Sequence, residues 1–578
     1  MLMPVKTKPA LIGPVILIIA LTAVIYCGAL MNSFVGDDIA VIVNNDFIKD
    51  WKNLPLVFSS AYLTDVRDLG FLGTRSVGAG EITYRPLATL SYFVDYHLWK
   101  LKAFGFHLTN LLLHIINALL IFALANILTG SHAVSLSAAL LFALHPVNSE
   151  AVNAICFRED LLAFLFFVSS LIFYIIRERS AGIRKTCAYG LSLAAFFLAL
   201  FSKEMAVTLP LVIILYDYYF AKKRGLTAAL ARLKSGYAGY FIILAFYLWI
   251  WGVVFKNPNP PAAYQANSLY AHILTMSTVI AGYIQWIAAP VQLYFAVTEP
   301  HLIVRHFNPE VFSSLLLIAA WIAAAIIIRK LAKEMSFSIA WFFVTLLPVS
   351  GIVPMQHIVG LRYLYIPIAG LCLFLALALK KTAGKLFRVI LVVILTVYAL
   401  LSMERTAVWS DNISLWSEIA ARYPDNYYAH YGLGEVFLKS GMQNRAGREF
   451  KTALRLNPKD AVLHYRLAYL YTAAGRYSEA EKAYKEAIAL DPGYLEACND
   501  LAALYSETNR LNEAIALWEK AVEIDPLFMT GHFNLAVFYF QNKQYGRAIK
   551  HADAVVNAGG KIDPAFMELL KPHRKTGQ

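Results

Sequence analysis

Charged residues are scarce in this sequence of 578 residues: Asp, Glu, Lys and Arg together make up 15% of it, while 59% of the residues are hydrophobic. Soluble domains average about a quarter charged residues and nearer half apolar residues. The shortage excludes a single water-soluble core, so most of the chain must face lipid. The apolar stretches end near Glu404, after which charged residues and helix-like Ala, Leu and Tyr patterns continue to the C-terminus.

Cysteine is scarce as well, since the chain has five cysteines and no C-x-x-C pair. This excludes a disulfide framework and a C-x-x-C metal site. The net charge is +13, but Lys and Arg cluster in short loops between apolar segments, where they set the orientation of a membrane protein. The excess of positive charge therefore does not indicate a nucleic-acid partner.

The apolar segments have the length of membrane spans. Residues 10–31 are long enough to cross a hydrocarbon core of roughly 30 Å, and their apolar run is too long for a signal peptide. Together with the segments that follow, they predict about eleven spans. The other segments are residues 107–129, 133–148, 157–177, 186–202, 206–221, 237–255, 310–328, 336–352, 361–379 and 386–403.

The basic loops predict the orientation of these spans. If the N-terminus is cytoplasmic, all of these basic loops lie on the cytoplasmic side of the membrane, as the positive-inside rule requires. A single membrane crossing by residues 271–297, which contain Pro290, would reverse the orientation of the later spans. We therefore expect this segment to form a re-entrant or interfacial hairpin. The loop 32–106 and the C-terminal region then lie outside the cytoplasm. The basic loops are residues 177–185, 222–234, 329–333 and 380–388.

The C-terminal region repeats itself every 34 residues, which is the period of tetratricopeptide repeats. Small residues and aromatic residues recur in step, and they predict helix pairs that stack into a solenoid with a groove for peptides or proteins. The sequence therefore predicts an all-α protein: a membrane helical domain over residues 1–404 and a soluble α-solenoid over residues 405–578. The prolines that mark the period are Pro424, Pro458, Pro492 and Pro526, followed by Ala446, Ala480, Ala514 and Ala548.

Ionisable residues at the ends of spans are costly and are candidates for function. Gly36, Asp37 and Asp38 follow the first span. Two adjacent acids can hold a cation, or one of them can act as a general base whose pKa is tuned by the other. The alternative is a solvated loop turn.

Further polar groups at predicted span ends map to the same face as the two acids. Cations at helix ends suit a lipid phosphate, which Arg can bind with two hydrogen bonds and Lys as a point charge. Helix caps, internal ion pairs and snorkelling side chains are the alternatives. Because all of these groups lie on the same predicted face of the membrane, we favour a functional site over these alternatives. These groups are His145, Glu150, Arg158, Lys203, Arg362 and Tyr363.

Several strings occur in order along the chain: SFVGDDIAVIVNN, YRPLATLSYFVDYHLW, GFHLTNLLLHIINALL, LHPVNSEAVNAICFREDLLAFLF, FSKEMAVTLP, LRYLYIPIAG and W-S-D-N-x-x-L-W. With the repeats that follow, they resemble the transmembrane and tetratricopeptide-repeat containing proteins. These are relatives of the protein O-mannosyltransferases in the GT-C class of membrane glycosyltransferases. The resemblance covers essentially the whole chain, and its four repeats and short loops indicate a compact, bacterial member of the inner membrane with its site on the periplasmic side.

The resemblance implies transfer of a sugar from a polyprenyl-phosphate carrier to an acceptor outside the cytoplasm. The acidic pair of the family's first outer loop corresponds to Asp37 and Asp38 in this chain. The resemblance implies that one of these two acids deprotonates the acceptor hydroxyl in an inverting displacement. A divalent metal stays open, because no His/Asp cluster has a diagnostic ligand spacing. The donor phosphate would be met by Arg158, Lys203 or Arg362, with Glu150, His145 and Tyr363 lining the site.

Three functions remain open at this point. The first is an inverting glycosyltransferase whose repeats recruit a protein acceptor. The second is a glycosyltransferase that acts on a lipid or a cell-envelope polymer. The third is a membrane scaffold without catalysis, in which the repeats bind a partner.

Overall fold

The computed structural model describes residues 11–59, 84–221, 236–254, 268–291, 293, 302–354, 357–382 and 384–574. Among these residues every regular element is a helix, as predicted. The chain forms two compact units, Met1–Leu415 and Trp416–Gln578. The division along the chain falls within α17 (Asn412–Arg422), somewhat later than the boundary expected after residue 404.

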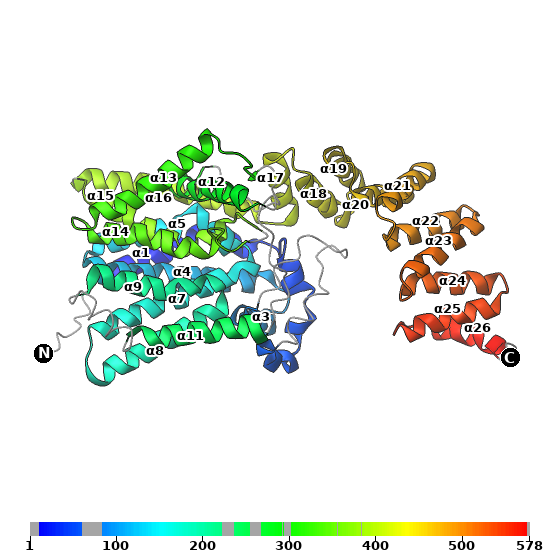
Figure 1. Cartoon of the computed structure of the whole chain (residues 1–578), viewed down its shortest axis with the longest axis horizontal. Coiled ribbons are helices and arrows are strands. Elements are labelled where there is room, and N and C mark those ends of the chain that lie inside the picture. Colours follow the sequence, from blue (N-terminus) through cyan, green and yellow to red (C-terminus); the bar gives the residue numbers. More distant parts are fainter. Residues whose placement is uncertain are drawn as a thin grey trace. The chain divides into compact units, whose positions relative to one another are not determined.

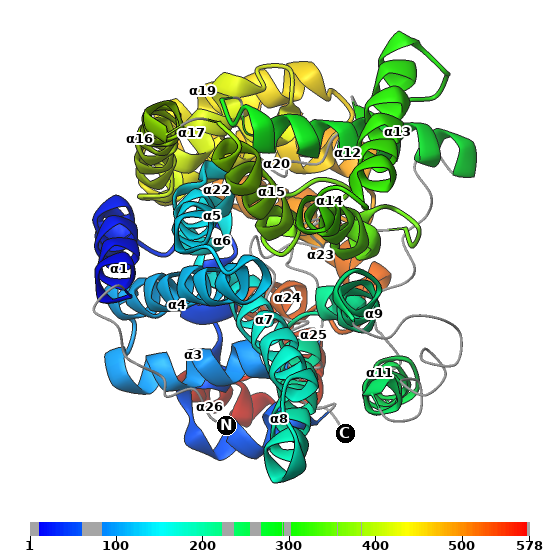
Figure 2. The same ribbon diagram turned by 90° about the vertical axis from the view of Figure 1, so that its left-hand side faces the viewer.

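Each predicted span contains a helix, and in the first unit these helices lie side by side (Figure 1; Figure 2 views them from one end). The basic segment 222–234 lies outside the described residues. The helices are α1 (Ile12–Tyr26), α4 (Ala103–Thr129), α5 (His132–Leu144), α7 (Arg158–Glu178), α8 (Gly182–Ser202), α9 (Leu209–Phe220), α11 (Ala238–Trp249), α13 (Pro309–Ile328), α14 (Lys333–Leu346), α15 (Ile368–Lys380) and α16 (Gly384–Val408). Three further helices are α3 (Pro86–Trp99), α6 (Ser149–Asn153) and α12 (Leu269–Ala288).

In the described part of the chain, seven helices are long and apolar enough to cross a membrane, which is fewer than the predicted spans. The difference arises because several helices stop early and continue as short 3-10 turns. Glu204–Thr208 precedes α9, Leu347–Val349 follows α14, and Leu361–Leu364 precedes α15. A tighter turn rises by about 2.0 Å per residue instead of 1.5 Å, so these segments gain length without a long α-helix.

These turns lie at one end of the first unit, which we call the site end. Arg85 pairs with both Glu159, at the start of α7, and Glu204, at the end of α8. The turn Leu347–Val349 packs against Glu204–Thr208. The ends of helices far apart in the sequence are therefore held together by polar contacts.

Helix α12 contacts the site end at both of its own ends. His272 Nε2 lies 2.7 Å from the Gly351 carbonyl oxygen, just after Leu347–Val349. Near the other end of α12, the Ile287 carbonyl oxygen lies 3.0 Å from His145 Nε2. A helix that crosses the unit would touch opposite ends, so α12 lies across the site end, although its length and composition would suit a span.

Of the hairpin predicted for residues 271–297, the described part contains the first arm, which is the continuous helix α12 and ends at Ala288. Pro290 lies two residues after Ala288, the last residue of α12, and so does not interrupt the hydrogen bonds of this helix. Residues 292 and 294–297 lie outside the described part of the chain.

The second unit confirms the predicted repeats, with helix pairs that follow one another along the chain (Figure 1). Buried aromatic rings at Phe450, Tyr484 and Trp518 fill the seams. In the first pair Gly434 allows close packing, because a Cβ there would lie 2.5 Å from the Phe450 ring. The pairs are α18 (Tyr427–Lys439) with α19 (Gln443–Leu456), α20 (Ala461–Ala473) with α21 (Tyr477–Leu490), α22 (Leu495–Glu507) with α23 (Leu511–Ile524), and α24 (Met529–Gln541) with α25 (Tyr545–Asn557), before α26 (Pro564–Arg574).

Candidate functional site

The loop after α1 carries the two candidate acids in different environments. Asp38 is fully buried, and its two carboxylate oxygens accept hydrogen bonds from Cys156 N–H at 2.7 Å and Val35 N–H at 3.1 Å. Burial raises the pKa of Asp38 to about 6, against the effect of these hydrogen bonds. Asp38 therefore fastens the loop to the start of α7.

Asp37 is half-buried, and its carboxylate makes no hydrogen bond or ion pair with a described residue. Burial raises the pKa of Asp37 above its ordinary value, the positive charge of Arg362 lowers it, and the charges of Glu159 and Glu150 raise it further. Of the two acids, Asp37 is thus the one whose carboxylate is available to a ligand. A carboxylate with a raised pKa is a better proton acceptor than an ordinary one when it is ionised.

Arg85, which sequence reasoning did not single out, bridges two carboxylates. It precedes α3, and Pro86 starts that helix with its fixed φ. Arg85 donates to Glu159 at 2.6 Å and, with two nitrogens, to Glu204 at 2.7 and 3.2 Å. Although burial alone would raise the pKa of Glu204, the charges of Arg85 and Lys203 lower it to about 2.

Lys203 lies in the same group of charges. It caps the end of α8, is buried, and donates to Asp160 at 2.6 Å, with Glu159 Oε1 3.6 Å from its Nζ. Glu159 and Asp160 occupy the first turn of α7, where carboxylates are favoured by the helix dipole. The Tyr363 ring centroid lies 5.8 Å from Lys203 Nζ.

Arg362 is the third cation at this end of the unit and the one whose charge acts on Asp37. Its guanidinium donates to Glu150 at 2.9 Å, and its backbone N–H donates to the same carboxylate at 3.2 Å. The guanidinium also lies over the rings of Phe157, at 4.2 Å, and Tyr363, at 4.9 Å. The turn Leu361–Leu364 and helix α6 therefore fix one cation and one carboxylate together.

Arg158 does not join this group. Its side chain is fully buried and pairs with Asp95 at 2.6 Å. It also donates to Asn110 at 2.7 Å, to the Phe106 carbonyl at 2.9 Å and to Ser91 at 3.1 Å. We therefore leave Arg158 out of the proposed phosphate ligands, because its side chain is 0% exposed, whereas those of Arg85 and Arg362 are 14% and 12% exposed.

His145 is likewise committed to the fold. Its Nδ1 accepts a hydrogen bond from Val147 N–H at 3.2 Å, and its Nε2 contacts the Ile287 carbonyl. The ring packs against Tyr398 at 4.4 Å between centroids. His145 holds the end of α5 against α12, and neither ring nitrogen is left for a ligand.

We call Asp37, Glu150, Glu159, Asp160, Glu204, Arg85, Lys203 and Arg362 the charged cluster. Its cations are held by carboxylates in fixed positions, so they are already oriented for an incoming anion. In the part of the chain that the structure describes, no group of three or more His, Cys, Asp or Glu side chains has the arrangement of a metal site.

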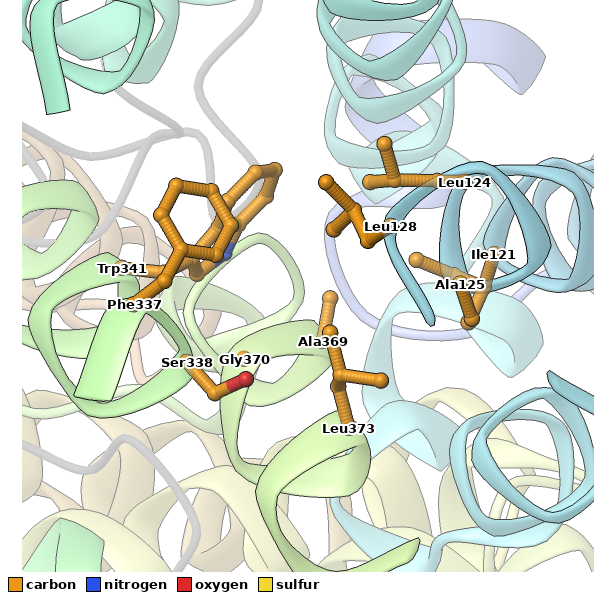
Figure 3. Close-up of a pocket in the computed structure, with 10 residues that line it drawn as sticks. All are labelled: Ile121, Leu124, Ala125, Leu128, Phe337, Ser338, Trp341, Ala369, Gly370 and Leu373. Atoms are coloured by element: carbon orange, nitrogen blue, oxygen red, sulfur yellow. The ribbon is translucent and has the colours of Figure 1, made fainter. Parts of the chain in front are cut away.

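A separate apolar pocket lies between α4, α14 and α15. Figure 3 shows the rings of Phe337 and Trp341 on one side of it and the side chains of Leu124 and Leu128 on the other. Its lining residues carry no charge, and Ser338 supplies their one side-chain hydroxyl. The pocket therefore lacks groups for proton transfer or phosphate binding, and the charged cluster remains the candidate site.

Comparison with known proteins adds evidence from both units. Models described as tetratricopeptide repeat match residues 444–494 and 472–527. The protein O-mannosyl-transferase F38B6.6 of Caenorhabditis elegans is 25% identical over 77% of this chain and 62% of its own length. Protein O-mannosyl-transferase TMTC1 of Mus musculus is 22% identical over 78% of this chain and 58% of its own length. Protein O-mannosyl-transferase tmtc2 of Xenopus laevis is 30% identical over 42% of this chain.

The homologues of this chain are TMTC protein O-mannosyl-transferases. The chain spans about three fifths of the length of the TMTC relatives named first. The charged cluster therefore belongs to a chain whose relatives are named as protein O-mannosyl-transferases.

Arg85 could have been found in the sequence only through the string YRPLATLSYF, where it is the single charge before a proline-initiated helix. Its partners lie 74 and 119 residues further along the chain. No local spacing connects such residues, whereas Asp37 and Asp38 stand out because they are adjacent.

Proposed function

We propose that this chain is a membrane glycosyltransferase that moves mannose or another hexose from a polyprenyl-phosphate carrier to a Ser or Thr hydroxyl of a protein, with inversion. The observation that carries the proposal is the half-buried Asp37, which makes no hydrogen bond or ion pair with a described residue, beside the fixed cation Arg362. The names of the TMTC relatives support the same reaction class.

In this mechanism Asp37 accepts the proton of the acceptor hydroxyl as its oxygen attacks the anomeric carbon of the sugar. The bond from that carbon to the phosphate oxygen breaks, and the polyprenyl phosphate leaves with its electron pair. Arg362 and Arg85, whose side chains are partly exposed, are the cations that stabilise the charge on the leaving phosphate, and the buried Lys203 adds its positive charge to the same cluster. One displacement with one base inverts the anomeric carbon and needs no covalent intermediate.

We place the charged cluster on the non-cytoplasmic side of the membrane. The opposite end of the first unit carries the basic residues that join consecutive helices, and the positive-inside rule assigns that end to the cytoplasm. Among the described residues these are Arg179, Arg184, Lys185, Arg329, Lys330, Lys333, Lys380, Lys381, Lys385 and Arg388.

The repeats would recruit the protein acceptor or a partner, since a stacked array offers a concave surface and no chemistry of its own. A chain that ends before Pro424 would then keep the charged cluster and lose the recruitment. We expect such a deletion to reduce labelling of the native acceptors, and unchanged labelling of every acceptor would contradict recruitment.

The test of the proposed function is transfer of radiolabelled sugar from synthetic polyprenyl-phosphate donors. Membranes that contain the chain would be supplied with undecaprenyl-phosphate and dolichyl-phosphate mannose and with other hexose donors, and the protein fraction would be counted. Label in a protein band that depends on the chain is the expected result. Absence of label with every donor would favour the scaffold, and label in lipid or polymer alone would favour the polymer acceptor.

The pH dependence of transfer gives a separate prediction. Because the pKa of Asp37 lies above its ordinary value of 3.8, transfer should rise with pH through a midpoint above 3.8, as the base becomes ionised. Glu150→Gln removes a charge that raises this pKa, so the midpoint should move to lower pH. Glu204→Gln serves as the control, since Glu204 is not among the groups that shift Asp37. A midpoint that does not move in Glu150→Gln would argue against Asp37 as the titrating base.

A further inference from the structure

The segment that follows α16 binds the loop that carries Asp37. Ser33 donates two hydrogen bonds to the Ser410 carbonyl, from its backbone N–H at 2.9 Å and from its hydroxyl at 3.0 Å. Gly36 N–H donates to the side-chain oxygen of Asn412 at 2.8 Å. All of these residues belong to the first unit, and Ser410 and Asn412 come from the string W-S-D-N-x-x-L-W.

The contact at Gly36 is made at the point where the loop turns. Gly36 has a φ of +57°, which side chains disfavour and glycine adopts freely. A Cβ at this position would meet nothing within 4 Å, so the glycine is needed for its conformation and not for space. Such a turn leaves a backbone N–H that needs a partner, and Asn412 supplies it.

No described residue makes a hydrogen bond that would fix the Asp37 carboxylate, so its place depends on its two neighbours. Asp38 is held on one side by Cys156 N–H and Val35 N–H. Gly36 is held on the other side by Asn412. The backbone of Asp37 thus lies between a contact to the turn that precedes α7 and a contact to the start of α17.

We propose that Asn412 is a positioning residue for Asp37: by accepting the Gly36 N–H, it sets where the Asp37 carboxylate stands relative to the acceptor hydroxyl. This rests on the proposed function, in which Asp37 is the base. The same residue begins α17, so the base is supported by the short segment that also leads into the repeats. A base displaced by about 1 Å can lose on the order of 100-fold in rate.

The test compares Asn412→Ala, which removes the acceptor, with Asn412→Asp, which keeps an oxygen for the Gly36 N–H. Ser414→Ala is the matched control, because Ser414 lies in the same turn of α17 and forms hydrogen bonds with Asp411 and Ser410. In membranes with the full-length protein, Asn412→Ala should lower kcat about 10- to 100-fold with little change in the KM for the polyprenyl-phosphate donor. Asn412→Asp should recover most of this loss, and Ser414→Ala should resemble the wild type.

A second measurement does not depend on activity. Hydrogen–deuterium exchange of the peptide that contains Gly36 should become faster in Asn412→Ala and stay unchanged in Ser414→Ala. Wild-type kcat and unchanged exchange in Asn412→Ala would overturn the proposal, as would an equal loss in the Ser414→Ala control. If the wild type transfers no sugar from any donor, the proposed function fails, and the exchange result still decides whether Asn412 holds the loop.

Discussion

Asp37→Asn should lose sugar transfer by about 100- to 10,000-fold, which is the usual contribution of a positioned general base, while the protein keeps its fold. The carboxylate of Asp37 makes no internal hydrogen bond or ion pair with a described residue, so the amide leaves no described partner unpaired. Asn has the same shape and cannot accept the proton of the acceptor hydroxyl. Transfer of radiolabelled sugar and the thermal unfolding of the detergent-solubilised protein would be measured together.

Asp38→Asn is the matched comparison, because it changes the neighbouring acid in the same way. Asp38 accepts one N–H on each carboxylate oxygen, from Cys156 and from Val35. An amide has one oxygen, so its NH₂ group would face one of these donors. Asp38→Asn should therefore lower thermal stability as well as activity. Full activity in Asp37→Asn would show that another group accepts the proton.

The helical content and the repeats could be predicted because both depend on local patterns. The 34-residue period places Gly434, Phe450 and Tyr484 correctly, since a repeat array buries the same positions in every unit. Pro290 predicted a break within the apolar segment 271–297, and α12 ends two residues before it, at Ala288; the sequence could not show that this helix lies across the site end.

The roles of the charged residues could not be predicted from sequence patterns. Arg158, Lys203 and Arg362 look alike in the sequence, as single cations near the ends of apolar segments. What distinguishes their roles is the partner of each side chain, which can lie far away in the sequence. Arg362, for example, pairs with Glu150, 212 residues away. Sequence patterns identify ionisable residues in costly places, but only packing decides which of them a ligand can reach.

Arg158→Met should destabilise the first unit by roughly 3–5 kcal/mol, the usual effect of removing one partner of a buried ion pair. The guanidinium is 0% exposed, and its loss leaves Asp95 buried without a cation. It also removes the hydrogen bonds to Asn110 and to the Phe106 carbonyl. Thermal unfolding of the solubilised protein, followed by its helical signal, would report the loss.

Arg362→Lys provides the contrast that separates a structural arginine from a ligand-binding one. It keeps the charge but loses the planar guanidinium that lies over Phe157, so the KM for the polyprenyl-phosphate donor should rise with a small change in stability. The Arg158→Met protein that remains folded should bind the donor with an unchanged KM. A raised donor KM together with normal thermal stability in Arg158→Met would show that Arg158 binds the donor phosphate. A buried cation that does not stabilise the fold must be retained for a ligand.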